Sequence, residues 1–398
     1  MTVEFRPVTA EEIDEFKAMP SYVFANPGMV DQASVMRPDW TSCAFVDGRL
    51  ATTFAAFPFR VRLNGRSTRM AGVTMVGTYP QYRRQGLLRQ IMVESFAQQR
   101  ERGQAIAILW ASMAAIYQRF GYGLATEKLS YSIDPRRGAL SEEREPVQPI
   151  DMGRFEQLRE VLVEIYGRFS EPRNVMIERA PALWDALVGG NSDPVYAAVT
   201  RDGGGTPVGY VLYRTSVDTA LPIGPNQVLQ VLDLVAADVA SVRSLWAFLR
   251  AHDLVSRITW ANAAPEDQLQ QLLAEPRELN RTVSDAVWMR ITDAKVALGQ
   301  RRYSEAGTLT MTIVDRDCDW NMGTFSLETD GEETHVGETT TEPDITLDAA
   351  ALACLVAGSR SATALSRAGR AVGANNAVLA RADRLFAPDY LPWCPNNF

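Results

Sequence analysis

The spacing of apolar residues in the first third of the chain contains two hairpin signals. Residues 44–59 form apolar runs on both sides of Asp47-Gly48, a dipeptide that favours a tight turn between strands. Asn64-Gly65 is a second signal of the same kind, and the Val- and Thr-rich residues 70–78 beyond it predict another strand. We therefore expect paired strands at the start of the chain.

A helical pattern follows these strands. Over residues 86–102, apolar side chains recur about every 3.6 residues, which predicts an amphipathic helix ending at Gly103. The continuous apolar run 105–110 predicts a buried strand, and residues 116–120 predict a short helix. This order of elements indicates a mixed α/β sheet. We expect a ligand site at the connection between the strand over residues 70–78 and the long helix.

The middle third repeats this order of elements. The charged, proline-containing stretch 136–149 predicts a linker. Beyond it we expect helices over 152–165, 176–187 and 242–254, and strands around 195–200, 208–214 and 228–236. The residues after the third strand, 238–241, include neither arginine nor glycine, so this third is predicted to be a degenerate copy without a phosphate-binding loop.

The last third is expected to form its own mixed domain. Its pattern predicts strands over 309–315 and 323–328, a helix capped by Asp348, a helix over 376–386 and an apolar tail over 391–398. At roughly 150 residues per domain, a chain of 398 residues favours two or three domains. We set their limits at residues 1–140, 141–292 and 293–398.

The charge balance narrows the classes of partner. A net charge of −8 disfavours nucleic acid and anionic membrane surfaces, and attracts a cationic small molecule. No apolar run reaches the ~18 residues of a membrane span, and the first residues do not resemble a secretory signal, so we expect a cytoplasmic protein. The four cysteines are far apart, which argues against both a zinc site and a disulfide framework.

The residues between the strand at 70–78 and the long helix carry an anion-binding pattern. They are Arg83, Arg84, Gln85, Gly86, Leu87 and Leu88. At a helix start the first-turn N–H groups lack intrahelical partners, and the helix dipole favours negative charge there. Arginine adds paired contacts to phosphate oxygens, so a diphosphate is the expected ligand. The spacing alone also fits a solvated basic helix start.

Together, residues 76–88 and the run Ile116-Tyr117-Gln118-Arg119-Phe120-Gly121-Tyr122-Gly123 resemble the GNAT superfamily of acetyltransferases, and more closely the Eis (enhanced intracellular survival) family. The resemblance covers essentially the whole chain. It implies two tandem GNAT-like α/β domains with mixed central sheets, the second without cofactor, followed by an α+β domain similar to sterol carrier proteins. It also implies a homo-hexamer.

The resemblance assigns a cofactor site. It implies that Val76, Gly77 and Thr78 hold the pantetheine arm of acetyl-CoA, that the loop from Arg83 to Leu88 holds the pyrophosphate, and that Ser112 passes near the thiol. Leu88 stands where many GNAT proteins have Gly or Ala, and it marks the Eis subfamily. No metal is implied.

Two residues are implied in catalysis. Tyr117 takes the position of the general acid toward the departing thiolate, although a helix-start tyrosine is also a common core residue. Because a phenol of pKa ~10 is a weaker acid than a thiol of pKa ~8.5, a hydrogen bond that strengthens with thiolate charge is the favoured role. Tyr122 is expected to be mainly structural.

The resemblance assigns base catalysis to the terminal carboxylate, which here belongs to Phe398. An amine of pKa ~10.4 is protonated at neutral pH, and deprotonating it costs about 4 to 5 kcal/mol, so a base is needed. A carboxylate of pKa ~3.5 favours a water-relayed transfer. Chain ends are usually disordered, but the apolar residues near this one favour an ordered, buried end.

Further residues are candidates for lining an amine-binding pocket. Phe24, Met29, Met36, Trp40 and Trp110 are candidate wall residues, each more often found in a core, and Asp31 and Asp39 are candidate partners for a cation. The predicted function is acetyl transfer from acetyl-CoA to a primary amine (aminoglycoside, polyamine or lysine-like) by direct attack in a ternary complex. A non-catalytic acetyl-CoA sensor and a lipid-binding protein are the alternatives.

Overall fold

A computed structural model describes residues 2–26, 35–141, 148–189 and 193–398. The chain divides into two compact units, which are described separately. The first contains Met1–Thr126, Asn174–Glu178 and Ala286–Phe398, and the second contains Glu127–Arg173 and Arg179–Asp285. None of the helices in the described ranges combines the length and the apolar character that a membrane crossing requires.

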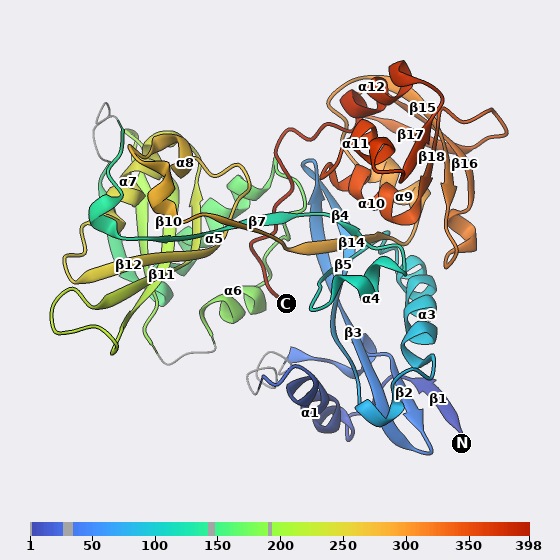
Figure 1. Cartoon of the computed structure of the whole chain (residues 1–398), viewed down its shortest axis with the longest axis horizontal. Helices are drawn as coiled ribbons and strands as arrows, with labels where there is room; N and C mark the ends of the chain where they lie inside the picture. Colours follow the sequence, from blue (N-terminus) through green and yellow to red (C-terminus); the bar gives the residue numbers. More distant parts are fainter. Residues whose placement is uncertain (1, 27–34, 142–147, 190–192) are drawn as a thin grey trace. The chain divides into compact units, whose positions relative to one another are not determined.

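The first unit contains a seven-stranded sheet in the order β1-β2-β3-β4-β5-β14-β6 (Figure 1). Its strands are β1 (Val3–Arg6), β2 (Cys43–Val46), β3 (Arg49–Leu63), β4 (Arg66–Thr78), β5 (Ile106–Trp110), β14 (Val287–Ile291) and β6 (Gly123–Leu124). β2, β3 and β4 are antiparallel neighbours joined at Asp47-Gly48 and Asn64-Gly65, so both predicted turns are confirmed. β4 and β5 run parallel.

Helices cover both faces of this sheet. They are α1 (Ile13–Val23), α3 (Leu87–Glu101) and the short α4 (Ala114–Gln118). Phe16 and Met19 of α1 pack with Phe57 on one face, whereas Ile91 and Phe96 of α3 pack with alanines of β3 and β4 on the other. Figure 1 shows β3 passing between the two helices. The predicted amphipathic helix and buried strand are therefore confirmed.

The sheet opens between β4 and β5. Their pairing ends at Gly72 and Ile108, while β4 continues to Thr78 against β3. The β3–β4 register shifts between Thr53 and Ala55, and Met75 adopts φ 54°, which makes a bulge in β4. The two strands therefore diverge beyond Gly72, and their separated ends border a cavity described below.

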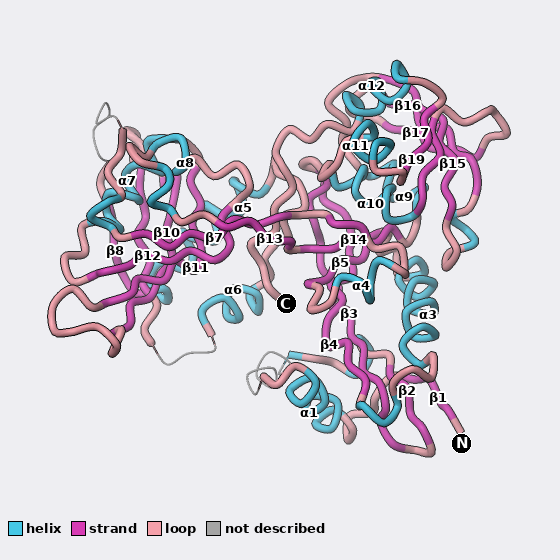
Figure 2. Tube along the Cα trace, in the orientation of Figure 1, coloured by secondary structure: helices cyan, strands magenta, loops and turns pink. Residues whose placement is uncertain are grey.

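The first unit also holds a five-stranded sheet in the order β17-β16-β15-β18-β19. Its strands are β15 (Gly307–Val314), β16 (Gly323–Thr329), β17 (Thr334–Glu338), β18 (Ile345–Asp348) and β19 (Ala371–Gly373). Its helices are α9 (Ala294–Gln300), α10 (Ala349–Ala357), α11 (Ala362–Arg367) and α12 (Asn376–Leu385), and Figure 2 shows α10, α11 and α12 grouped together beside the strands. The Asp348 carboxylate accepts from the Ala351 N–H at 2.7 Å, which confirms the predicted cap.

A glycine permits close packing between α10 and the larger sheet. A Cβ atom on Gly123 would lie 2.2 Å from the carbonyl oxygen of Ala350 and 2.8 Å from Cys354 Sγ. Any side chain at this position would displace the helix, so the second glycine of the run Phe120-Gly121-Tyr122-Gly123 has a packing role.

The second unit is built on the sheet β13-β7-β12-β11-β10-β9-β8. Its strands are β7 (Glu127–Ile133), β8 (Ile150–Arg154), β9 (Tyr196–Arg201), β10 (Pro207–Val217), β11 (Gln227–Ala236), β12 (Val255–Ala263) and β13 (Thr282–Asp285), and its helices are α5 (Phe155–Ser170), α6 (Pro181–Val188), α7 (Val239–Arg250) and α8 (Leu269–Leu272). After β11, the Asp238 side chain caps α7 through the Ser241 N–H. At the helix start where the first domain has its phosphate-binding loop, this unit therefore has an aspartate that caps the helix.

Three helix predictions in the middle third are wrong in their limits. Residues 152–154 belong to β8, and α5 begins only at Phe155. Residues 176–178 are extended beside β3, with the Arg62 N–H donating to the Met176 carbonyl, and the helix starts at Pro181. α7 ends at Arg250 instead of Leu254. In the first two cases pairing with a distant strand overrides a local helical pattern.

Candidate functional site

A cavity of about 960 Å³ lies where β4 gives way to α3. Every residue that the sequence predicted for the cofactor lines this cavity: Val76, Gly77, Thr78, Arg83, Arg84, Gln85, Gly86, Leu87, Leu88 and Ser112. Tyr117 lines it as well. The structure therefore gathers the predicted loop, the end of β4 and residues of α4 around one space.

The backbone of the loop before α3 is shaped for an anion. Gly86 is the N-cap of α3 with φ 83°, and Arg84 also adopts a left-handed conformation at φ 64°. Gly86 offers no side-chain cap, and the first intrahelical bond is donated by the Gln90 N–H to the Gly86 carbonyl. The first-turn N–H groups are thus directed out of the helix start, which is the arrangement that binds phosphate.

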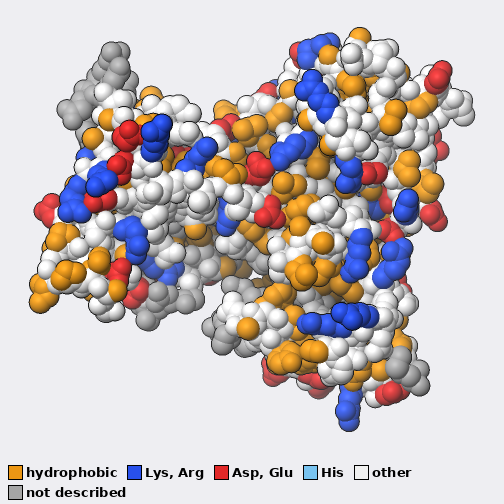
Figure 3. Space-filling view, in the orientation of Figure 1, with side chains coloured by type: hydrophobic (Ala, Val, Ile, Leu, Met, Phe, Trp, Pro, Cys, Tyr) orange, Lys and Arg blue, Asp and Glu red, His pale blue; other side chains and the backbone are white. Residues whose placement is uncertain are grey.

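Basic side chains lie around this helix start. The Nε atom of Arg83 donates to the Thr78 carbonyl at 3.1 Å, which ties the loop to the end of β4. The first turn of α3 contains no acidic residue. Figure 3 shows Lys and Arg side chains grouped over the region of α3 and α4. The loop can therefore neutralise a diphosphate without an opposing carboxylate in the helix's own first turn.

Tyr117 lies at the junction of two cavities. It lines the large cavity and also a smaller one of about 260 Å³. Its side chain is buried, its ring meets that of Tyr122 edge to face at 5.8 Å, and burial raises the pKa of Tyr117 to about 12. Within the described part of the chain its hydroxyl has no hydrogen-bond partner, so it is available to a ligand.

The smaller cavity occupies the opening between β4 and β5. Its walls come from the end of α1, the diverging ends of the two strands, α4 and the end of the chain. The lining residues are Phe24, Asn26, Val73, Thr74, Met75, Val76, Leu109, Trp110, Ser112, Tyr117 and Phe398. Ser112, Val76 and Tyr117 line both cavities, so a group held in one space adjoins a group held in the other.

The end of the chain is held in place at this cavity. The Trp110 indole Nε1 donates to the Asn396 carbonyl at 2.8 Å, and the ring of Phe398 meets that of Phe59 at 5.4 Å. Asn396 is only 2% exposed. Upstream, the Trp393 N–H donates to the Asn174 carbonyl at 3.1 Å. The last residues therefore contact Trp110 and Phe59 of the sheet, although chain ends often lack such contacts.

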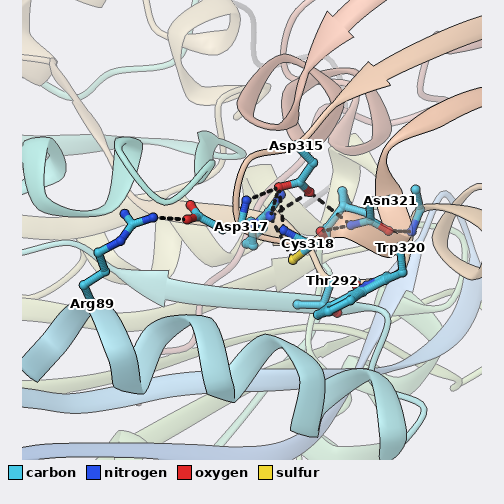
Figure 4. Close-up of polar contacts among 10 residues, drawn as sticks. Arg89, Thr292, Asp315, Asp317, Cys318, Trp320 and Asn321 are labelled. Carbon is cyan, nitrogen blue, oxygen red and sulfur yellow. Dashed lines mark hydrogen bonds and ion pairs between the residues drawn. The ribbon is translucent and has the colours of Figure 1, made fainter.

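A second set of contacts reaches α3 from the loop between β15 and β16. We call residues 315–321 the clasp (Figure 4). The Asp317 carboxylate pairs with Arg89, a residue of the first turn of α3 that also lines the large cavity, at 2.8 Å. Asp315 accepts two bonds from the buried Arg290 of β14 at 2.6 and 2.7 Å. The Trp320 indole donates to the Thr292 carbonyl at 2.7 Å.

Sequence models of known domains match three parts of the chain. A model of the acetyltransferase (GNAT) domain matches residues 4–125, and a second acetyltransferase (GNAT) domain model matches residues 175–291. A sterol carrier protein domain model matches residues 294–395. The predicted fold class, two GNAT domains followed by a domain like sterol carrier proteins, is confirmed.

Relatives that align with most of the chain are also named N-acetyltransferases. An uncharacterized N-acetyltransferase of Streptomyces avermitilis is 30% identical, over 100% of this chain and 99% of that protein. The N-acetyltransferase Eis of Mycobacterium tuberculosis is 29% identical, over 80% of this chain and 78% of its own. The crystal structure of Eis1 from Mycobacterium abscessus matches with a TM-score of 0.86 at 27% identity, covering 100% of both chains. This chain belongs to the Eis-like family of GNAT N-acetyltransferases. The resemblance predicted from its motifs is confirmed, and the protein is an acetyltransferase.

The candidate pocket residues of this Eis-like enzyme lie in different places. Phe24 and Trp110 line the smaller cavity, whereas Met36 is buried in the core under α1. Trp40 packs edge to face on Phe57 and borders a different cavity. Met29 and Asp31 lie outside the described residues. Asp39 pairs with Arg37 at 3.0 Å and lines that different cavity, so it does not face Tyr117.

Several lining residues of the Eis-like enzyme were missed. Val73, Thr74 and Met75 line the smaller cavity because β4 bulges there, and Met113 and Arg119 line the larger one. A β-bulge leaves no distinctive pattern in a Val- and Thr-rich strand. Met113 and Arg119 flank the Ile116–Tyr117 run, so their closeness to the motif was the available signal.

Proposed function

We propose that this Eis-like enzyme transfers the acetyl group of acetyl-CoA to a primary amine by direct attack in a ternary complex. The observation that carries the proposal is that Tyr117 and Ser112 line both cavities and that Phe398 lines the smaller one. A thioester held along β4 and an amine held between β4 and β5 would meet at these residues, which supplies the proximity that a two-substrate reaction needs.

In this proposal acetyl-CoA binds in the larger cavity. The uncapped start of α3 would receive the pyrophosphate, with Arg83 and Arg84 beside it. Val76, Gly77 and Thr78 border the route toward Ser112, where the pantetheine arm would pair with the edge of β4 beyond its pairing with β5. A Cβ atom on Gly77 would lie 3.3 Å from Val23, so a larger residue would narrow the route.

Tyr117 would stabilise the departing thiolate by donating a hydrogen bond. Burial raises its pKa to about 12, so complete transfer of its proton to a thiolate, whose thiol has a pKa of about 8.5, is uphill by about 5 kcal/mol. The phenol would therefore keep its proton and strengthen its hydrogen bond as charge develops on sulfur. Tyr122 is fully buried and lines neither cavity, which supports a structural role for it.

The α-carboxylate of Phe398 would receive the amine proton through water. At neutral pH it is ionised, and its low basicity favours a shared transfer over outright abstraction. The contacts of Trp110 and Phe59 with the last three residues support this assignment, because a base must be held within reach of the amine.

The other sequence predictions stand as proposals beside this function. We retain domain limits at residues 140 and 292, a small-molecule amine as partner without nucleic acid or membrane, a cytoplasmic setting and a hexamer. The aminoglycoside, polyamine and lysine-like classes of amine are the starting range for the acceptor.

Thiol release from acetyl-CoA in the presence of a panel of amines tests the proposal. We expect release that depends on both substrates and yields one acetylated amine per thiol. Measurable CoA binding with no release for any amine would overturn the proposal in favour of an acetyl-CoA sensor.

A further inference from the structure

The ion pair between Arg89 and Asp317 joins the first turn of α3 to the sterol carrier protein domain of the chain. Arg89 lines the larger cavity and its side chain is 61% exposed, whereas the side chain of Asp317 is only 7% exposed. An ion pair with one exposed partner contributes little to stability. The nearly buried carboxylate beside a residue of the proposed cofactor cavity therefore suggests a role in binding.

Asp317 is held in place by the clasp. Asp315 accepts from the Asp317 N–H and from the Cys318 N–H, each at 3.2 Å. Asp315 in turn accepts from the guanidinium of Arg290 at 2.6 Å and from the Asn321 amide at 3.2 Å, and these three side chains are buried (Figure 4). The turn that carries Asp317 is therefore fixed by buried polar contacts, and its carboxylate has a defined position beside the start of α3.

Arg89 lies where a cation is unfavourable in the free protein. The positive end of the helix dipole is at the start of α3, and Arg89 is in the first turn. Arg83 and Arg84 line the same cavity and add like charges. These charges would turn the flexible side chain of Arg89 toward solvent. Asp317 compensates them and holds the guanidinium at 2.8 Å.

The ion pair leaves Arg89 able to bind a second anion. The bond to Asp317 is donated by one Nη atom, and a guanidinium carries five N–H groups in a planar fork. One guanidinium can therefore bridge a carboxylate and a phosphate oxygen. Because the side chain is already ordered, a phosphate that binds to it loses less free energy to the ordering of a long side chain.

We propose that Asp317 is a positioning residue for the cofactor. It holds Arg89 so that the guanidinium receives a phosphate group of acetyl-CoA, and through this contact the C-terminal domain strengthens cofactor binding without touching the cofactor. The inference rests on the proposed function, because it takes acetyl-CoA as the ligand of the larger cavity.

Asp317→Ala in the full chain tests the inference by separating Kd from kcat. We expect the Kd for acetyl-CoA to rise threefold to tenfold, measured by titration calorimetry, while kcat at saturating acetyl-CoA stays within twofold of the parent. Arg100→Ala is the matched control, because it removes another ion pair of α3, to Asp293 at 3.1 Å, and lines neither cavity. Its Kd should stay within twofold. An unchanged or lower Kd in Asp317→Ala overturns the inference.

A double-mutant cycle tests whether Asp317 acts through Arg89. We expect Arg89→Ala to raise the Kd for acetyl-CoA at least as much as Asp317→Ala does. In the Arg89→Ala background, the further change Asp317→Ala should alter the Kd less than twofold. If Asp317→Ala weakens binding as much in that background as in the parent, the carboxylate does not act through Arg89, and the inference is wrong.

Acetyl-pantetheine tests whether the effect depends on phosphate. This thioester carries the reacting group of acetyl-CoA and lacks all of its phosphates. We expect kcat/KM for acetyl-pantetheine to be the same within twofold in Asp317→Ala and the parent. A loss as large as that for acetyl-CoA would contradict a role at the phosphates.

The failure of this inference differs from the failure of the proposed function. If the function is wrong, no amine releases thiol from acetyl-CoA in the parent protein. If only the inference is wrong, thiol is released and acetyl-CoA binds equally well to the parent and to Asp317→Ala.

Discussion

The indole Nε1 of Trp110 donates a hydrogen bond of 2.8 Å to the carbonyl oxygen of Asn396. Trp110 is the last residue of β5 and Asn396 lies two residues before the end of the chain, so the bond joins segments 286 residues apart. It holds the tail against the strand that borders the smaller cavity. Acetyl transfer should therefore depend on contacts that never touch the cofactor.

Trp110→Phe tests this dependence. The substitution keeps an aromatic wall and removes the donor, which weakens the anchor of the tail by about 1 kcal/mol. We expect kcat to fall about fivefold to tenfold while the Kd for acetyl-CoA changes less than twofold, by stopped-flow and titration calorimetry. Trp320→Phe is the matched control, because it removes a 2.7 Å indole bond to Thr292 outside both cavities. Equal losses of kcat in both variants would contradict the positioning role of Trp110.

Tyr117→Phe tests the proposed hydrogen bond to sulfur. We expect kcat to fall about tenfold to a hundredfold with little change in acetyl-CoA affinity, because the bond strengthens only as the thiolate forms. Tyr122→Phe is the matched control, since its hydroxyl is buried without a partner in the described chain and lines neither cavity. That variant should retain kcat and stability. A normal rate in Tyr117→Phe would remove the residue from the mechanism.

The pH profile tests the protonation state of Tyr117. Burial raises its pKa to about 12, so the neutral phenol is the folded-state form and its contribution to stability is lost only as pH rises from about 10 through 12. Because the free amine is the nucleophile, kcat/KM should rise from pH 7 to 9.5 without a descending limb. A descending limb near pH 8 that disappears in Tyr117→Phe would show that the phenol ionises far earlier than proposed.

Two carboxylates of the clasp should differ sharply in their effect on stability. Asp315 pairs with Arg290, and both side chains are at most 2% exposed, whereas Asp317 pairs with Arg89, whose side chain is 61% exposed. Asp315→Ala leaves a buried charge unpaired and should destabilise by about 3 to 5 kcal/mol. Asp317→Ala should cost under about 1 kcal/mol. Chemical denaturation measures the free energy of unfolding of both variants. Similar losses of stability in the two would show that the Asp315–Arg290 pair is not the more important one.

Local sequence signals predicted the core of the site. Asp47-Gly48, Asn64-Gly65 and the spacing of apolar residues in α3 act over a few residues, and each produced the expected element. The loop before Leu87 was predictable for the same reason, because a helix start and its neighbouring arginines are adjacent in the chain. The roles of these residues rest on the resemblance and stay predictions.

Pairings between distant strands could not be predicted from the sequence. β14 pairs with β5, more than 170 residues earlier, and the segment at Met176 pairs with β3 although its local pattern favours a helix. The bulge at Met75, which opens the smaller cavity, depends on the register against Thr53 and Ala55. Such features are fixed by packing between distant segments and leave no periodic signal.

The most direct test concerns the terminal carboxylate. Cys394 is the fifth residue from the end, so the peptide Cys394–Phe398 can be joined by native chemical ligation to residues 1–393, with either a carboxylate or a carboxamide at Phe398. We expect the carboxamide protein to bind acetyl-CoA within twofold of the ligated carboxylate protein but to lose kcat at least a hundredfold. Equal kcat in the two ligated proteins would show that the terminal carboxylate is not the base.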